Sequence, residues 1–249
     1  MENGFERPMT KSPGILLKGR HCIDGIALFD ANLHISSEQW TCLLGRSGVG
    51  KSTILRLILG LETGGHFTGS FTASDDMPLA GRISYMAQSD LLLPWLSVLD
   101  NVCIGAHLRG EKPDIGFAND LLGRVGLFEH IDQKPNTLSG GMRQRAALAR
   151  TLFEDRPIVF LDEPFSSLDA GTRADMQELA TKVLKDRTVL LVTHDPAEAA
   201  RIGHQIIVMS AQETHNWPVP PTPVLREIND PQTLVCQAKL LDYLRGIAA

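Results

Sequence analysis

Residues 45–52, GRSGVGKS, constrain the fold of this chain more than any other stretch, because they match the pattern G-x-x-x-x-G-K-S in full. The apolar run WTCLL precedes them, and an apolar stretch that predicts a helix over 52–61 follows. A strand, a glycine-rich loop and a helix in this order form a cradle for phosphate, since backbone N–H groups curl around the oxygens and the helix N-terminus adds positive potential. We therefore expect an α/β fold with a phosphate ligand at a strand end.

Two side chains of this loop add chemistry that the backbone lacks. Lys51 is predicted to reach the β- and γ-phosphates of a nucleotide, and the Ser52 hydroxyl to bind Mg²⁺. An accidental glycine-rich turn is the alternative, and the complete strand–loop–helix order argues against it. The predicted nucleotide contacts form one continuous stretch: Gly45, Arg46, Ser47, Gly48, Val49, Gly50, Lys51, Ser52 and Thr53.

Two adjacent carboxylates end a second apolar run, PIVFLDEP at 157–164. A strand buried on both faces has this composition, and an acid at its carboxyl end projects into the crevice where ligands of parallel sheets bind. Asp162 is predicted to hold Mg²⁺, directly or through water. Glu163 is predicted to orient an attacking water and accept its proton. A solvated turn residue is the alternative for Glu163, and the phosphate loop in the same chain favours catalysis.

Two further polar residues follow predicted strands. His194 ends the run 188–193, so it is expected at the same edge of the sheet as the carboxylates. The other seven histidines have no ligand spacing, and the position of its strand singles out His194. Gln88 ends the run RISYMAQ where helical spacing begins, and both a catalytic role and an ordinary polar turn fit that place.

A second candidate cradle lies at 138–145, LSGGMRQR. Ser139, Gly140 and Gly141 precede a run that predicts a helix over 142–153. A hydroxyl and two glycines at a helix N-terminus make a second anion site in a chain that already has one.

Hydrophobic patterning predicts the organisation of the rest. After a flexible lead at 1–13, strands are expected between 14 and 44, a hairpin at 67–74 and helical spacing over 91–153. Strand-like runs at 157–161 and 188–193 flank a helix predicted over 170–186, which implies parallel strands with a helical crossover. A Pro-rich strap at 217–223 precedes a last helix, 231–246, whose face of Leu234, Ala238, Leu241 and Leu244 is expected to pack on the body.

Composition narrows the partners. A net charge of −5 over 249 residues argues against nucleic acid as the main ligand, which usually requires a basic face. The four cysteines, without metal-ligand or C-x-x-C spacing, are expected to be reduced and mostly buried. The first residues carry charge and proline where a signal peptide needs an apolar run, and no run approaches 18 apolar residues. We therefore expect any contact with a membrane to go through a partner.

Together, GRSGVGKS, Gln88, LSGGMRQR, VFLDEP, SSLD at 166–169 and TH at 193–194 resemble, in order and spacing, the nucleotide-binding subunit of an ABC transporter. The resemblance implies one ABC ATPase domain over 1–249: a P-loop NTPase fold with a RecA-like, mainly parallel α/β core, an antiparallel β subdomain and an inserted α-helical subdomain. Its implied parts are 14–88 (β subdomain and phosphate-loop part of the core), 89–153 (helical subdomain with the LSGG motif), 154–210 (rest of the core) and 211–249 (strap and C-terminal helix).

The resemblance also implies a use for both cradles. ATP and Mg²⁺ are the implied ligands, and a homodimer places each ATP between the phosphate loop of one copy and residues 139–141 of the other. Asp169 resembles the acid that crosses the dimer interface, and His194 the residue at the γ-phosphate. Gln88 resembles the lid residue that contacts Mg²⁺ and water and responds to the membrane partner.

The run LLLPWLSVLDNV at 91–102 resembles the coupling segment of importers for nitrate, sulfonates, taurine and thiamine-precursor pyrimidines. This implies integral membrane permease subunits, an extracytoplasmic solute-binding protein and a peripheral place on the cytoplasmic face of the inner membrane. Leu92 and Trp95 are then expected in the groove that receives a permease helix, and core packing is the alternative for Trp95. A soluble ABC ATPase of iron–sulfur assembly and an ABC exporter ATPase remain as alternative functions.

One feature departs from the family pattern. An aromatic residue that stacks on adenine is usual 23 to 25 positions before the phosphate loop, whereas this chain has GRHCIDG there. His21, Cys22 or Ile23 would have to take that place.

Overall fold

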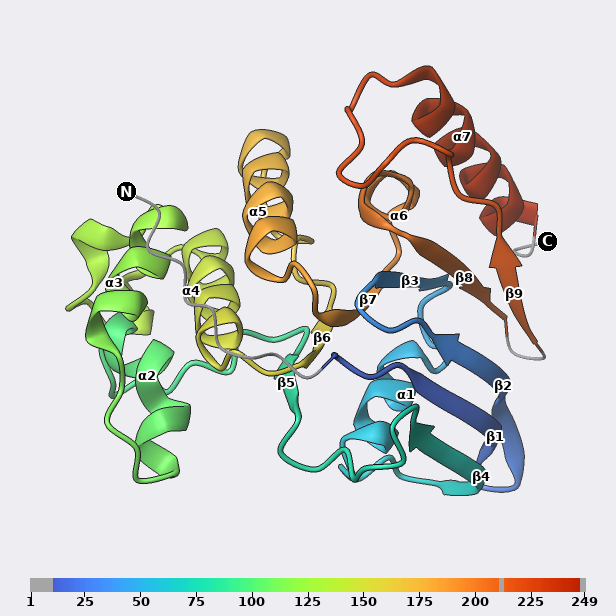
Figure 1. Cartoon of the computed structure of the whole chain (residues 1–249), viewed down its shortest axis with the longest axis horizontal. Helices are drawn as coiled ribbons and strands as arrows, with labels where there is room; N and C mark the ends of the chain where they lie inside the picture. Colours follow the sequence, from blue (N-terminus) through green and yellow to red (C-terminus); the bar gives the residue numbers. More distant parts are fainter. Residues whose placement is uncertain (1–10, 211–212, 247–249) are drawn as a thin grey trace.

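The computed structural model describes residues 11–210 and 213–246, built around a six-stranded sheet of order β5-β6-β7-β3-β8-β9 (Figure 1). Five strands are parallel, and β9 pairs antiparallel with β8. The strands are β3 (Trp40–Gly45), β5 (Ile83–Met86), β6 (Ile158–Asp162), β7 (Thr188–Thr193), β8 (Gln205–Met209) and β9 (Thr214–Trp217). The strands predicted at 157–161 and 188–193 are confirmed.

Successive side chains of the central strands point to opposite faces of the sheet, and each face has its own hydrophobic core. Every residue of β3, β6 and β7 is buried, as expected for strands covered on both faces. Phe160 belongs to the core between this sheet and a second sheet, whereas its neighbour Leu161 faces the core shared with the helices. The predicted α/β architecture, with a mainly parallel sheet, an antiparallel sheet and a helical group, is confirmed.

The second sheet has three antiparallel strands in the order β2-β1-β4: β1 (Ile15–Ile23), β2 (Ile26–Ile35) and β4 (His66–Ala73). The hairpin predicted at 67–74 is wrong, because these residues form the single strand β4. Gly69 pairs directly with Gly19, and a Cβ at Gly69 would lie 2.6 Å from the Gly19 Cα. This glycine therefore permits a close approach of two strands rather than a turn.

Helix α1 (Lys51–Ile58) lies beside the second sheet (Figure 1) and ends earlier than predicted. Gly60 has φ +70° and the Leu61 N–H donates to the Arg56 carbonyl at 2.8 Å, so a left-handed glycine closes the helix.

Residues between β5 and β6 form the helical group, at the far side of β6 from β3 (Figure 1). It contains α2 (Val98–Leu108), α3 (Ile115–Arg124), the short 3₁₀ turns Phe128–His130 and Pro135–Thr137, and α4 (Gly140–Phe153). Ser97 and Asp114 cap the N-termini of α2 and α3 by accepting from Asp100 N and Phe117 N. The predicted helical insertion thus stands between two neighbouring parallel strands.

Three helices follow β6: α5 (Ala170–Val183), α6 (Pro196–Ile202) and α7 (Pro231–Gly246). Helix α7 has the predicted bounds, but of the predicted buried face only Leu244 packs against the core. Leu234 and Leu241 are 47% and 46% exposed, whereas Cys236 and Leu240 are buried. The helix carries two apolar stripes. The stripe beside Tyr243 packs against β9, where the ring centroids of Tyr243 and Trp217 lie 5.0 Å apart.

Trp217, predicted within the strap, is instead the last residue of β9. Arg226 fastens the segment that follows: its guanidinium is buried and donates to the carbonyls of Ala200, Gly203, Pro220 and Thr222 at 2.8–3.0 Å. Burial lowers the pKa of Arg226 from its ordinary value.

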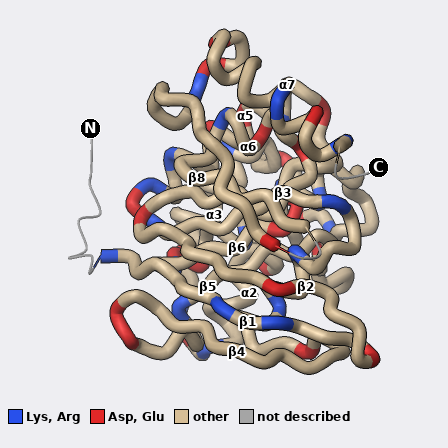
Figure 2. The backbone as a smooth tube through the Cα atoms, turned by 90° about the vertical axis from the view of Figure 1, so that its right-hand side faces the viewer, with Lys and Arg blue, Asp and Glu red and all other residues tan. Residues whose placement is uncertain are grey.

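The flexible lead predicted at 1–13 is wrong for the part that the structure describes, which begins at residue 11. Residues 1–10 lie outside the described residues, but Ser12 is buried and its hydroxyl donates to the Asp186 carbonyl at 2.9 Å. The four cysteines are free, and three are buried as predicted. Lys and Arg are interspersed with Asp and Glu over the face seen in Figure 2. Among the described residues, no helix is long and apolar enough to cross a membrane.

Candidate functional site

Register brings the predicted site residues to one edge of the central sheet. Leu44 of β3 pairs with Thr193 of β7, and Asp162 of β6 pairs with Val192. The three strands are neighbours and parallel, so the phosphate loop, the carboxylates and His194 all follow carboxyl ends that lie side by side.

The phosphate loop connects β3 to α1 with two left-handed glycines. Gly48 has φ +81° and Gly50 has φ +103°, a region that other residues rarely adopt. At Gly45 a Cβ would lie 2.5 Å from the Met209 carbonyl oxygen, so that position also requires glycine. Gly50 caps α1 without a side-chain hydrogen bond, which leaves the first N–H groups of the helix to a ligand.

Lys51 is buried, and its Nζ donates to the carbonyls of Gly45 and Arg46 at 2.8 and 2.9 Å. Burial lowers the pKa of Lys51, and the carboxylates of Glu163 and Asp162 oppose that shift. The ammonium thus lies within the curl of the loop, where anionic oxygens would be better partners than neutral carbonyls.

The remaining loop residues surround this ammonium. Arg46, Ser47 and Gly48 are exposed, and Val49, Ser52 and Thr53 are half-buried.

Asp162 is a buried carboxylate with one unpartnered oxygen. Its Oδ1 has no hydrogen-bond partner in the structure. Burial raises the pKa of Asp162, while hydrogen bonds with Ser52 and Tyr85 and the charge of Lys51 lower it. Burial beside Asp162 also raises the pKa of Tyr85, to about 12.

These residues fit Mg²⁺. A buried oxygen without a partner beside a serine hydroxyl suits a hard cation, which takes one or two protein ligands and completes its shell with phosphate and water. Among the described residues, no group of three His, Cys, Asp or Glu gathers as a metal cage. Asp162 and Ser52 would therefore hold the ion together with a bound ligand.

Glu163 meets the two other predicted catalytic residues. Its φ is +51°, and its N–H donates to the Val192 carbonyl at 2.9 Å. Its Oε1 lies 3.1 Å from His194 Nδ1, and its Oε2 accepts from Gln88 Nε2 at 3.4 Å. The structure thus brings Gln88, Glu163 and His194 together from three strand ends. The carboxylate is aimed between them, and the His194 side chain is 58% exposed.

The second cradle faces outward. Ser139 caps α4 by accepting from Met142 N at 3.2 Å, and Ser139 and Gly140 are exposed. Helices α4 and α1, each of which begins at one of the two cradles, lie well apart in Figure 1. Asp169 is exposed too, and it caps α5 by accepting from Thr172 N at 3.0 Å.

Comparison with known proteins places the chain in a family. The model of the family described as "ABC transporter" matches residues 28–166. The chain belongs to the ABC transporter family.

Curated ABC relatives cover nearly the whole chain. It is 40% identical over 242 residues to the aliphatic sulfonates import ATP-binding protein SsuB 1 of Rhodococcus jostii, covering 95% of this chain and 96% of the relative. It is 42% identical over 231 residues to an uncharacterized ABC transporter ATP-binding protein of Haemophilus influenzae, covering 90% and 95%. A solved dimeric ATP-binding cassette, in a post-hydrolysis state with ADP and Pi, superposes with TM-score 0.70 at 30% identity, covering 86% and 99%.

The structure of this ABC chain adds a polar residue that sequence reasoning missed. Gln144 of α4 is buried, its Nε2 donates to the Glu163 carbonyl at 2.9 Å, and its Oε1 accepts from Ser167 N at 3.0 Å. Ser167 Oγ also donates to the same oxygen. Gln144 thus ties the helix of the second cradle to the loop after β6. The one sequence signal was a glutamine on the helix face that otherwise carries alanine and leucine.

Two expectations about exposed contacts need correction. His21 is fully buried and stacks on Phe29 with ring centroids 5.5 Å apart, so it cannot stack on an adenine. Cys22 and Ile23 are half-buried.

In the run 91–102, Leu92 is 8% exposed and packs in the core, whereas Leu91 and Trp95 are 63% and 67% exposed. Leu91 and Trp95 are thus the exposed large apolar side chains of this run, and Leu92 is not.

Proposed function

We propose that this chain is the ATP-hydrolysing subunit of an ABC importer, and that Glu163 is its general base. The observation that carries the proposal is the placement of the Glu163 carboxylate between Gln88 and His194, beside the phosphate loop. An attacking water needs a base within hydrogen-bond reach and a neighbour that stabilises charge on the γ-phosphate. Glu163 supplies the first and His194 the second.

The nucleotide is held mainly by backbone and one ammonium. The N–H groups of residues 48–53 and the positive end of α1 face the β-phosphate, and Lys51 exchanges its two carbonyl partners for phosphate oxygens. Asp162 and Ser52 would hold Mg²⁺, with Gln88 as a further proposed ligand, and the ion would supply positive charge against the phosphate oxygens.

Two copies of the chain complete each site. Ser139 and Gly140 are exposed, and their helix α4 lies apart from α1 in Figure 1, so this cradle is available to the ATP of a partner copy. Asp169, also exposed, is placed to cross the same interface. The dimeric relative bound to ADP and Pi supports this arrangement. ATP then closes the dimer because both cradles bind one ligand, and hydrolysis releases it.

The transport role rests on relatives that serve aliphatic sulfonate import. We infer permease subunits, an extracytoplasmic solute-binding protein and a peripheral position on the cytoplasmic face of the inner membrane. Leu91 and Trp95 form the apolar surface on which a permease helix would dock. We propose that the transported solute belongs to the class of nitrate, sulfonates, taurine and thiamine-precursor pyrimidines.

Fractionation tests the importer role against the soluble alternative. The chain should sediment with membranes of its native cell and leave them together with a permease in detergent. Trp95→Ala should weaken the association at least about fivefold, because a large exposed aromatic is a typical anchor. Leu108→Ala is the matched control, since Leu108 is 80% exposed on the C-terminal end of α2. Recovery of the wild type only in a soluble complex would contradict the importer role.

A further inference from the structure

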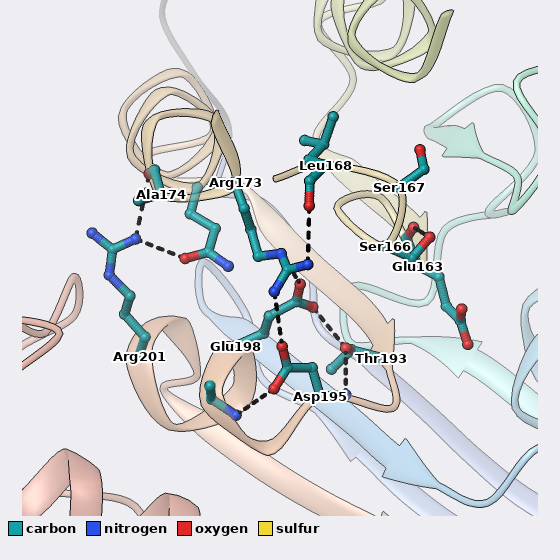
Figure 3. A network of polar contacts seen from close by, with 12 residues as sticks. Glu163, Ser166, Ser167, Leu168, Arg173, Ala174, Thr193, Asp195, Glu198 and Arg201 are labelled. Carbon is teal, nitrogen blue, oxygen red and sulfur yellow. Dashed lines mark hydrogen bonds and ion pairs between the residues drawn. The ribbon is translucent and has the colours of Figure 1, made fainter. Parts of the chain in front are cut away.

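Arg173, in the first turn of α5, reaches two loops at once (Figure 3). Its Nη2 donates to the Leu168 carbonyl at 3.1 Å, directly before Asp169. Its Nη1 lies 3.5 Å from Asp195 Oδ2, and its Nε lies 3.9 Å from Glu198 Oε1. Leu168 belongs to the loop after β6, and Asp195 follows His194, so one guanidinium connects the loop of Glu163 and Asp169 with the loop of His194.

The two connections differ in strength. The bond to Leu168 has the length of a formed hydrogen bond, whereas the contacts to the two carboxylates are too long to be good ones. Arg173 Nε accordingly has no hydrogen-bond partner although it is buried. We call these contacts of Arg173 the clamp. Its bond to Leu168 is formed, whereas its contacts to Asp195 and Glu198 would need a movement of ~1 Å or less to reach hydrogen-bond distance.

Hydrogen bonds tie the loop of His194 together on the other side of Arg173. Thr193 Oγ1 donates to Glu198 Oε2 at 2.6 Å and accepts from Asp195 N at 3.0 Å. Asp195 Oδ1 also caps α6 by accepting from Ala197 N at 2.8 Å. A pull on Asp195 or Glu198 therefore acts on the strand end that carries His194.

We propose that Arg173 is a positioning residue that couples the dimer interface at Asp169 to the placement of His194. A partner copy that docks on Asp169 shifts the Leu168 carbonyl, and Arg173, bonded to that carbonyl, closes on Asp195 and Glu198. The contact of His194 with Glu163 is already present in the single chain, and the closed clamp holds His194 in place for the γ-phosphate only when the interface has formed. The coupling rests on the proposed function, because it requires a dimeric ATPase in which His194 acts.

A purely structural clasp between α5 and α6 is the competing explanation for Arg173. A clasp predicts that loss of activity follows loss of thermal stability, and that cooperativity between the two sites is unchanged. Coupling predicts a fall in kcat with an unchanged KM for ATP, and a Hill coefficient that falls toward one.

Three variants separate these explanations. Arg173→Gln removes the charge, and Asp195→Asn removes its partner charge while asparagine still caps α6. Arg173→Lys keeps the positive charge but lacks the planar guanidinium group whose separate nitrogens reach both loops. Arg124→Gln is the matched control, because Arg124 pairs with Asp120 on the exposed face of α3.

The experiment measures ATP hydrolysis by the full chain, with KM, kcat, Hill coefficient and melting temperature for each variant. We expect Arg173→Gln and Asp195→Asn each to lower kcat about tenfold with KM within about twofold, and the double variant to be no slower than either single one. Arg173→Lys should recover part of kcat but not the cooperativity. Arg124→Gln should match the wild type.

Two results would overturn the coupling. One is unchanged kcat and Hill coefficient in Asp195→Asn, and the other is effects of Arg173→Gln and Asp195→Asn that multiply in the double variant. If Arg173→Gln fails to fold, Asp195→Asn and Arg173→Lys decide the question. If the wild type hydrolyses no ATP, both the proposed function and the coupling are contradicted. If the wild type is active and the Arg173 and Asp195 variants have its kcat and Hill coefficient, only the coupling is contradicted.

Discussion

His194 Nδ1 lies 3.1 Å from Glu163 Oε1, although the two residues follow different strands and α5 separates them in the chain. Parallel pairing of β6 with β7 creates this contact, since it brings both carboxyl ends to one edge. The imidazole therefore fixes the direction of a carboxylate that also accepts from Gln88.

His194→Ala should leave ATP binding intact and lower hydrolysis at least about a hundredfold, because it removes both the orientation of Glu163 and a charge partner for the γ-phosphate. Single-turnover hydrolysis and equilibrium binding of ATP measure the two effects separately. His107→Ala, at an exposed site on α2, serves as the control. An active His194→Ala enzyme would show that the contact is structural.

Lys51→Met should abolish the thermal stabilisation that ATP gives while leaving the nucleotide-free protein at least as stable. The ammonium is buried and its pKa is lowered by burial, so its removal relieves a desolvation cost while the methionine stem keeps the packing. Thermal melts with and without Mg-ATP measure both effects, with exposed Lys239→Met as the control. Wild-type stabilisation by ATP in Lys51→Met would contradict the role of the loop.

Mixing two inactive variants tests the shared site. Ser139→Arg blocks the cradle offered to a partner, and Lys51→Ala disables the phosphate loop. A heterodimer of the two has one interface with both lesions and one with neither, so activity should rise above that of either variant alone. Hydrolysis measured against mixing ratio should peak near equal amounts, at up to about one quarter of the wild-type rate if each site works independently. A rate that never exceeds the sum of the two variants would argue against independent shared sites.

Glu198 should make stability depend on pH. It is buried beside Thr193, and burial raises its pKa from 4.5 to about 7, with Asp195 adding to the shift and Arg173 and His194 opposing it. The folded state holds the proton more tightly than the unfolded state, so stability from this group is complete below pH 4.5 and is lost as pH rises to about 7.

Glu198→Gln should remove that loss, which amounts to roughly 3 kcal/mol at most. Urea unfolding between pH 4.5 and 8 measures the free energy of unfolding, with Glu178→Gln, a more exposed residue on α5, as control. Equal pH slopes for wild type and Glu198→Gln would contradict the assignment.

Sequence patterns predicted the residues that the backbone alone places. Gly48, Gly50 and Lys51 follow from one strand–loop–helix pattern, and Asp162, Glu163 and His194 follow from the rule that parallel strands meet at their carboxyl ends. These placements need no knowledge of side-chain packing.

The patterns could not predict contacts that depend on tertiary packing. Gln144 and Arg173 act on loops whose shapes exist only in the folded chain. Leu241 was assigned to the buried face of α7 because two apolar stripes compete there, and only the packing of Trp217 against Tyr243 selects one. Gly69 was taken as part of a turn because close strand approach and turn formation both require glycine.

Hydrolysis of ATP by Glu163→Gln tests the central claim most directly. Glutamine keeps the size of the side chain but cannot accept the proton of water, so the variant should bind ATP as the wild type does and form a stable dimer. Its kcat should fall by about a hundredfold or more, whereas Glu62→Gln, at an exposed site after α1, should be normal. A Glu163→Gln protein that hydrolyses ATP at the wild-type rate would contradict the account.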